Sequence, residues 1–179
     1  MPVEKTKTYF PLSLDEAKRH LRVDVDYNED DDYINDLIYA ATREAENYIG
    51  KDIALTSNVA NIFKFSGDDI RINEGNCLQV NEVISDSSTL IVPAVTKIFY
   101  NYFEVELSSY INYTNEYVPL QVKFDTGYDA GDCPQDIKQA ILIKIANMYD
   151  VNREDSSPAY LKDSYASNNL LNSYKQILF

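Results

Sequence analysis

An acidic stretch near the start of the chain carries alternating oxygen ligands of the kind that bind calcium. Its side chains at the odd positions of an EF-hand-like frame are Asp24, Asp26, Asn28, Asp30 and Asp32. An EF-hand also needs a glycine for its sharp turn and a bidentate glutamate at its end, and the chain has Glu29 and Asn35 at these two places. We therefore favour a solvated loop whose last aspartates cap the following helix, and keep a small calcium-binding module as the alternative.

Other residues that could perform catalysis or hold a metal are scarce. The one histidine, His20, cannot by itself supply a histidine-based metal site or a Ser-His-Asp triad. Cys77 and Cys133 lie far apart and in no metal-ligand spacing, so we expect two reduced thiols, with a single disulfide as the alternative. Nucleophile-elbow, P-loop, zinc-protease and dinucleotide-binding motifs do not occur in the sequence. We predict no enzymatic activity and no cofactor.

The composition limits the partners. The 179 residues include 29 acidic and 16 basic side chains, which give a formal net charge of −13. Capture of DNA phosphates or of anionic lipid needs a cationic surface. The sequence has no apolar run near the ~18 residues that span a bilayer and no apolar signal-peptide stretch. We expect a soluble, intracellular, acidic protein that can stand beside DNA without holding it.

Two helices flank the acidic stretch. Ser13 and Glu16 have the spacing of a capping box, and apolar residues then recur at helical spacing, which predicts a helix over residues 13–22. A longer helix is predicted over residues 31–49, with Gly50 as its stop signal. Its apolar stripe consists of Ile34, Leu37, Ile38, Ala41, Ala45, Tyr48 and Ile49.

The middle of the chain changes to strand-like composition. We predict five to seven short strands between residues 54 and 127, separated by turn-forming residues. The strand-like runs are 59–65, 70–72, 78–84, 89–92, 98–107 and 120–124. Tyrosines are frequent in this segment, and they suit either half-buried strand positions or contacts with other proteins.

A third helix begins near Pro134 and is apolar on nearly every side. One stripe consists of Ile137, Ala140, Ile141, Ile145, Met148 and Tyr149. Leu142, Ile143 and Ala146 fall on its other faces. A helix that is apolar all round is either central to the core or shared between the core and a partner subunit, and for the second case these three residues are the predicted subunit contacts.

The last part of the chain has a looser helical pattern after a polar connector. Its apolar edge consists of Leu170, Leu171, Tyr174, Ile177, Leu178 and Phe179. Such a segment is typical of an arm that becomes ordered on a partner. Together the patterns predict an α+β fold, a helical core with an inserted β-rich segment. Its parts are N-terminal helices (1–53), the β-rich insertion (54–127), a core helix (128–157) and a C-terminal arm (158–179).

Several short motifs, taken in order, resemble tailed-phage head–tail connector proteins, the adaptor or head-completion family. The first block is SLDEA at 13–17, HLRVD at 20–24, DDYI at 31–34 and AENYIG at 45–50. The second is VKFDTGY at 122–128, CPQDIKQAI at 133–141 and YDVNRE at 149–154, and LLNSYK at 170–175 is similar to the family's ending. The chain departs from the family at Met148, where a tryptophan is common, and its β segment is longer than in the all-helical members.

The resemblance implies a structural virion protein of the neck, assembled in the host cytoplasm and without cofactor or membrane contact. Such adaptors form a ring of copies under the portal, usually twelve, and extend the channel through which DNA passes without sequence-specific binding. They also give the next tail component, a stopper or tail protein, its docking platform. On this basis the apolar edge of the C-terminal arm is expected to bind the portal. Another neck or tail completion role is the alternative within the same class.

Overall fold

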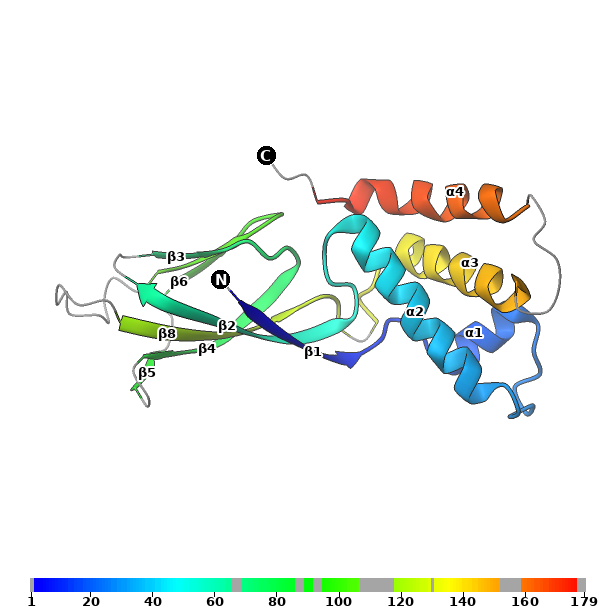
Figure 1. Ribbon diagram of the computed structural model, residues 1–179, viewed down its shortest axis with the longest axis horizontal. Coiled ribbons are helices and arrows are strands. Elements are labelled where there is room, and N and C mark those ends of the chain that lie inside the picture. The colour runs from blue at the N-terminus through cyan, green and yellow to red at the C-terminus, as the bar shows by residue number, and fades with distance from the viewer. Residues whose placement is uncertain are drawn as a thin grey trace. The chain divides into compact units, whose positions relative to one another are not determined.

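The computed structural model describes residues 2–65, 69–85, 89–91, 95–106, 118–129, 131–151 and 159–176. They fall into two compact units (Figure 1). The helical unit comprises Phe10–Ile53 and Asp129–Lys175, and the β unit comprises Met1–Tyr9, Ala54–Tyr128 and Gln176–Phe179. The predicted α+β class, a helical core with a β-rich segment, is confirmed.

The first two helices of the helical unit begin and end close to where the sequence predicts. In α1 (Leu14–Leu21) the Ser13 hydroxyl accepts from the Glu16 amide at 3.2 Å and the Glu16 carboxylate accepts from the Ser13 amide at 2.9 Å, which is a complete capping box. The hydrogen bond from the Ser13 amide holds the pKa of Glu16 below its ordinary value of 4.5. The second helix, α2 (Asp31–Ile49), ends at Gly50 with a φ of 75°.

Two further helices complete the helical unit. They are α3 (Gln135–Val151) and α4 (Ala159–Leu171), and a short 3₁₀ turn (Asn172–Tyr174) follows α4. The fully buried aliphatic residues of this unit include Ile34 and Ile49 from α2, Ile137, Ile141 and Ile145 from α3, and Leu171 from α4. The buried Lys144 ammonium contacts Glu44 of α2 at 2.6 Å and Asn168 of α4 at 3.4 Å, so one side chain of α3 links three helices.

The β unit consists of two antiparallel sheets. Within the described residues the larger sheet has the order β1-β2-β8-β4-β5 and the smaller β3-β7-β6. The strands are β1 (Val3–Tyr9), β2 (Leu55–Phe65), β3 (Asp69–Ile72), β4 (Cys77–Ser85), β5 (Thr89–Ile91), β6 (Val95–Ile98), β7 (Phe103–Glu106) and β8 (Val118–Thr126). The termini of the inserted segment therefore lie on β2 and β8, which pair with one another along most of their length.

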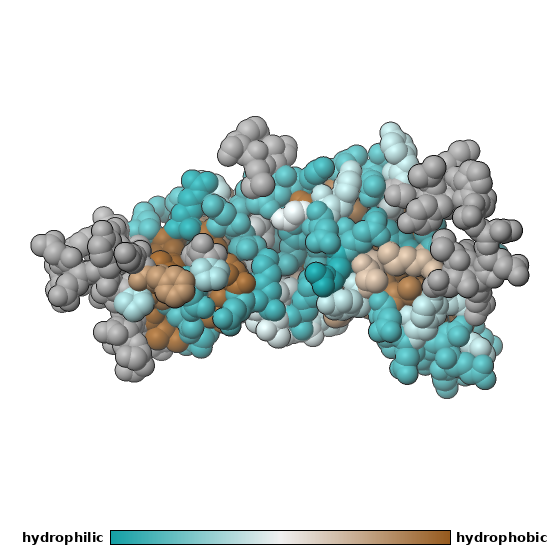
Figure 2. Space-filling model, in the orientation of Figure 1, coloured by the Kyte–Doolittle hydropathy of each residue, from teal (hydrophilic) through white to brown (hydrophobic). Residues whose placement is uncertain are grey.

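Both sheets contribute to one apolar core. Phe124 of the central strand β8 and Phe103 of the central strand β7 are fully buried, and their ring centroids lie 4.9 Å apart. Val3, Ile62 and Val80 pack against this core while staying partly exposed. Figure 2 shows hydrophobic residues gathered on the visible face of the β unit, among polar ones.

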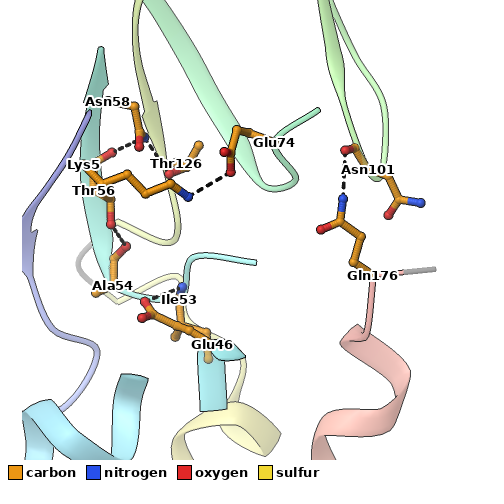
Figure 3. A network of polar contacts seen from close by, with 10 residues as sticks. All are labelled: Lys5, Glu46, Ile53, Ala54, Thr56, Asn58, Glu74, Asn101, Thr126 and Gln176. Carbon is orange, nitrogen blue, oxygen red and sulfur yellow. Dashed lines mark hydrogen bonds and ion pairs between the residues drawn. The ribbon is translucent and has the colours of Figure 1, made fainter. Parts of the chain in front are cut away.

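A buried polar group completes the core of the β unit. The Asn58 amide donates to the Thr56 carbonyl at 3.0 Å and to the Thr126 hydroxyl at 2.8 Å, and the Thr56 hydroxyl donates to the Ala54 carbonyl (Figure 3). Because Asn58 and Thr126 are buried, the hydrogen bond between their side chains favours the observed register of β2 and β8.

The β unit differs from the sequence prediction at β6, at the turn that follows β6 and at β1. Residues 95–97 of β6 lie in none of the predicted runs. The run 98–107, expected as one strand, is interrupted: β6 ends at Ile98, β7 begins at Phe103, and the Phe99 amide donates to the Tyr102 carbonyl at 2.9 Å to close the turn. The first strand, β1, was not predicted. It is an edge strand whose side chains are mostly exposed, so it lacks the apolar alternation on which strand prediction depends.

Candidate functional site

The acidic loop closes around an ammonium group that the chain itself supplies. Lys18 of α1 is 1% exposed, and its Nζ donates to the carbonyl oxygens of Val25 at 3.1 Å and Tyr27 at 2.8 Å. The same ammonium forms an ion pair with Asp31 at the start of α2. Two carbonyls and a carboxylate thus surround one positive charge, which is the kind of ligand set that a bound cation would use.

The remaining acidic residues of the loop are engaged elsewhere or exposed. Asp24 accepts from the Asp26 amide at 3.2 Å, and Asp30 accepts from the Tyr149 hydroxyl at 2.7 Å. Asp30 is the N-cap residue of α2 and Asp31 and Asp32 lie in its first turn, as predicted, although the Asp30 side chain makes no capping hydrogen bond. Asn28 and Asp32 are exposed. In the part of the chain that the structure describes, no three acidic, histidine or cysteine side chains gather as a metal site would require.

Lys18 is the residue that the sequence prediction missed. The spacing of Lys18 predicts a buried position, because it lies four residues after Leu14 and three before Leu21, on the apolar stripe of α1. A lysine on the buried face of an amphipathic helix requires oxygen partners, and the following loop is rich in them. A contact between the Lys18 ammonium and oxygen atoms of residues 24–32 could therefore have been predicted from the sequence.

The two cysteines are buried free thiols, as expected, and they belong to different units. Burial, with a smaller contribution from the negative charge of Asp125, raises the pKa of Cys77 to about 12. Burial raises the pKa of Cys133 to about 11. Because the thiolate is the reactive form, both residues are suited to packing rather than to nucleophilic chemistry. His20 is half-buried on α1.

The face of α3 predicted to contact a neighbouring subunit stays partly open. Leu142, Ile143 and Ala146 are each half-buried, whereas Ile141 and Ile145 of the same helix are fully buried. The helical unit therefore covers one side of α3 completely and leaves apolar surface on another. The contact with a second subunit stays a prediction.

The residues predicted to bind the portal differ in how the structure places them. Leu171 is fully buried in the helical unit, while Leu170 and Tyr174 are half-buried. Ile177, Leu178 and Phe179 lie outside the described residues. The start of the arm is held on α2, because the Tyr48 hydroxyl donates to Asn172 at 2.6 Å and the Lys175 ammonium lies 4.8 Å from the Tyr48 ring centroid. Leu171 therefore anchors the arm, and the later residues are the better candidates for a partner.

These features define a class of protein before any comparison is made. The chain has an α+β fold, an apolar surface on α3 that its own core leaves partly open, and an apolar C-terminal arm. Apolar surfaces of this kind are typical of proteins that assemble with other subunits. No helix among the described residues is both long and apolar enough to cross a bilayer. A family model described as "Phage gp6-like head-tail connector protein" matches residues 11–109, and the chain belongs to this family.

The comparison with solved structures extends the likeness to the whole chain. A chain of the neck of an empty gene transfer agent particle, computed with C6 symmetry, has a TM-score of 0.76 at 15% identity. A chain of the neck of the native particle, computed with C12 symmetry, has a TM-score of 0.71 at 16% identity. Both matches cover 100% of this chain and 97% of the other, and they show that the two-unit fold is shared. No curated protein matches the sequence.

Family membership gives the function in outline. The chain is a structural head–tail connector, and its place is the junction between the head and the tail of a phage-like particle. The loop around Lys18 is then part of the scaffold that holds α1 and α2 together, and the surfaces of α3 and of the arm are the candidates for assembly.

Proposed function

We propose that the chain assembles with copies of itself into a closed ring beneath the portal. The ring extends the DNA channel and gives the next tail component its docking platform, and the chain has no enzymatic role. The observation that carries the proposal is membership of the connector family together with a whole-chain likeness to neck proteins. The similar necks were computed with C6 and with C12 symmetry, and a ring of twelve copies is compatible with both.

A closed ring requires a heterologous interface, in which two different faces of each subunit meet. The partly open side of α3 with Leu142, Ile143 and Ala146 supplies one such face. Its apolar surface is best buried against a different surface of the neighbouring copy, because a face that met itself would give a dimer instead.

The charge of the chain fits a conduit for DNA. A net charge of −13 on every copy repels phosphates, so DNA can move through the ring without adhering to its wall. A cationic, sequence-reading surface would hold DNA in place, which a channel must avoid.

The ring is tested by mixing the chain with its portal and counting subunits by mass photometry and negative-stain microscopy. We expect rings on the portal for the parent chain. Leu142→Asp should abolish them, because every junction of the ring would bury an unpaired carboxylate. Tyr165→Asp, at a 71% exposed position of α4, is the matched control and should still form rings. A parent chain that stays monomeric and ignores the portal would refute the proposal.

A second experiment tests the portal-binding arm. Deleting Leu170 to Phe179 would also remove the buried Leu171, so the deletion of residues 177–179 is the cleaner variant. We expect it to keep the helical circular dichroism of the parent and to lose portal binding in a pull-down with purified portal. Tyr174→Ala, which keeps the apolar end, should weaken binding less. Unchanged binding after the deletion would remove these residues from the interface.

A further inference from the structure

The outward side of α2 carries a second partly exposed surface of the helical unit. Tyr39 is 45% exposed, and the Phe10 ring lies against it with the ring centroids 5.6 Å apart. The Arg43 guanidinium lies 5.9 Å from the Tyr39 ring centroid, and its Nη1 donates to the Tyr39 hydroxyl at 3.4 Å. Tyrosine and arginine are enriched among the residues that dominate the binding energy of protein interfaces. Phe10, Tyr39 and Arg43 are here named the aromatic patch.

The aromatic patch and the open side of α3 face in opposite directions. The Glu44 carboxylate accepts from the Lys144 ammonium at 2.6 Å, so these two residues mark where α2 and α3 meet. Tyr39 precedes Glu44 by five residues, which places their side chains about 140° apart around α2. Leu142 and Ala146 are each two residues from Lys144, about 160° away around α3. The two surfaces therefore lie on opposite sides of the pair of helices, as a head-to-tail contact requires.

The charges on these two surfaces favour a second copy of the chain as the partner. Copies that each carry a net charge of −13 repel one another, so they meet most easily where carboxylates are absent or paired. Residues 137–149, which include the open side of α3, contain no aspartate or glutamate. The exposed residues of α2 within 39–47 include one carboxylate, Glu44, and Lys144 neutralises it. Arg43 adds a positive charge to the aromatic patch, so little repulsion opposes the contact.

We propose that the aromatic patch of one copy packs on the open side of α3 of the next copy. This contact deepens the proposed ring and rests on it. Because the Tyr39 ring already contacts Phe10 and Arg43, it loses little conformational entropy on docking. Repeated from copy to copy, the contact buries both surfaces of every subunit, and closure of the ring leaves neither surface unused.

Tyr39→Glu tests the contact, because it places a carboxylate against the apolar side chains of the neighbouring α3. On the portal we expect the parent to form rings and the variant to form at least ~10-fold fewer, counted by negative-stain microscopy. The loss is large because it recurs at every junction of the ring. Tyr165→Glu, the same change at a 71% exposed position of α4, is the matched control and should form rings as the parent does.

A photo-crosslink locates the contact directly. We place p-benzoylphenylalanine at position 39 and irradiate rings assembled on the portal. The expected products are covalent dimers in which position 39 of one copy is joined to residues 139–147 of another, as identified by mass spectrometry. The same group at position 165 should not reach that segment.

The outcomes separate the proposed contact from the proposed function. If the parent forms rings but position 39 crosslinks to the portal, to another segment or to no second copy, the contact is overturned and the ring stands. A folded Tyr39→Glu variant that forms rings as the parent does also overturns the contact. Circular dichroism shows whether this variant is folded, and if it is not, the crosslink decides. A parent chain that forms no rings refutes the proposed function, and the contact falls with it.

Discussion

Replacing Lys18 with methionine is expected to lower the free energy of unfolding of the helical unit by about 3 kcal/mol. Methionine keeps the length of the side chain but removes the charge and the donors. The carbonyls of Val25 and Tyr27 then face a thioether, and Asp31 loses its cation. The change is measured by urea denaturation followed through the helical circular dichroism signal.

The matched control for Lys18 lies on the same helix. Arg19→Met also removes a positive charge, but Arg19 is exposed and bonds only the carbonyl of Asp15 among the contacts described. We expect a loss within ~0.5 kcal/mol, as for most surface substitutions. Equal losses from the two variants would show that net charge, rather than the buried ammonium, matters. Millimolar calcium should leave the stability of the parent unchanged, whereas a calcium-binding loop would be stabilised.

Phe124→Ala is expected to cost about 3–5 kcal/mol of stability in the β unit. Phe124 is fully buried on the central strand of the larger sheet, and it meets Phe103 on the central strand of the smaller one. Removing the ring leaves a cavity at the contact between the two sheets, and rigid strands cannot move together to fill it.

Hydrogen exchange of the β2 and β8 amides measures this loss in the β unit directly, without interference from the helices. Phe63→Ala removes the same atoms from a 71% exposed position and is expected to change exchange very little. A loss below ~1 kcal/mol for Phe124→Ala would mean that the two sheets do not depend on the aromatic pair.

The helices could be predicted from the sequence because their signals are local. The range 31–49 coincides with α2, since an apolar stripe, acidic residues at the start and Gly50 at the end all agree. The capping box at Ser13 was likewise confirmed. Lys18 was missed, although its spacing places it on the buried stripe, because its oxygen partners come from the loop that follows the helix and not from the helix itself.

The β unit was harder to predict, because its pairings depend on distant residues. β1 belongs to the larger sheet through contacts with β2, some fifty positions later, and nothing local marks it as a strand. The turn at 99–102 contains neither glycine nor proline, so the run read as one strand. Periodicity showed that Leu171 is on an apolar edge, but only packing against the other helices could show that it is buried.

The division of the chain into units has a mechanical consequence. The backbone passes between them at Tyr9–Phe10, Ile53–Ala54, Tyr128–Asp129 and Lys175–Gln176. A force applied to one unit is thus shared by at least three covalent segments in parallel, those that lead into strands β1, β2 and β8. Pulling the units apart would require strands β2 and β8 to be stripped from the middle of a sheet. For a head–tail connector, this path of the backbone is expected to make separation of the two units a late event under mechanical load.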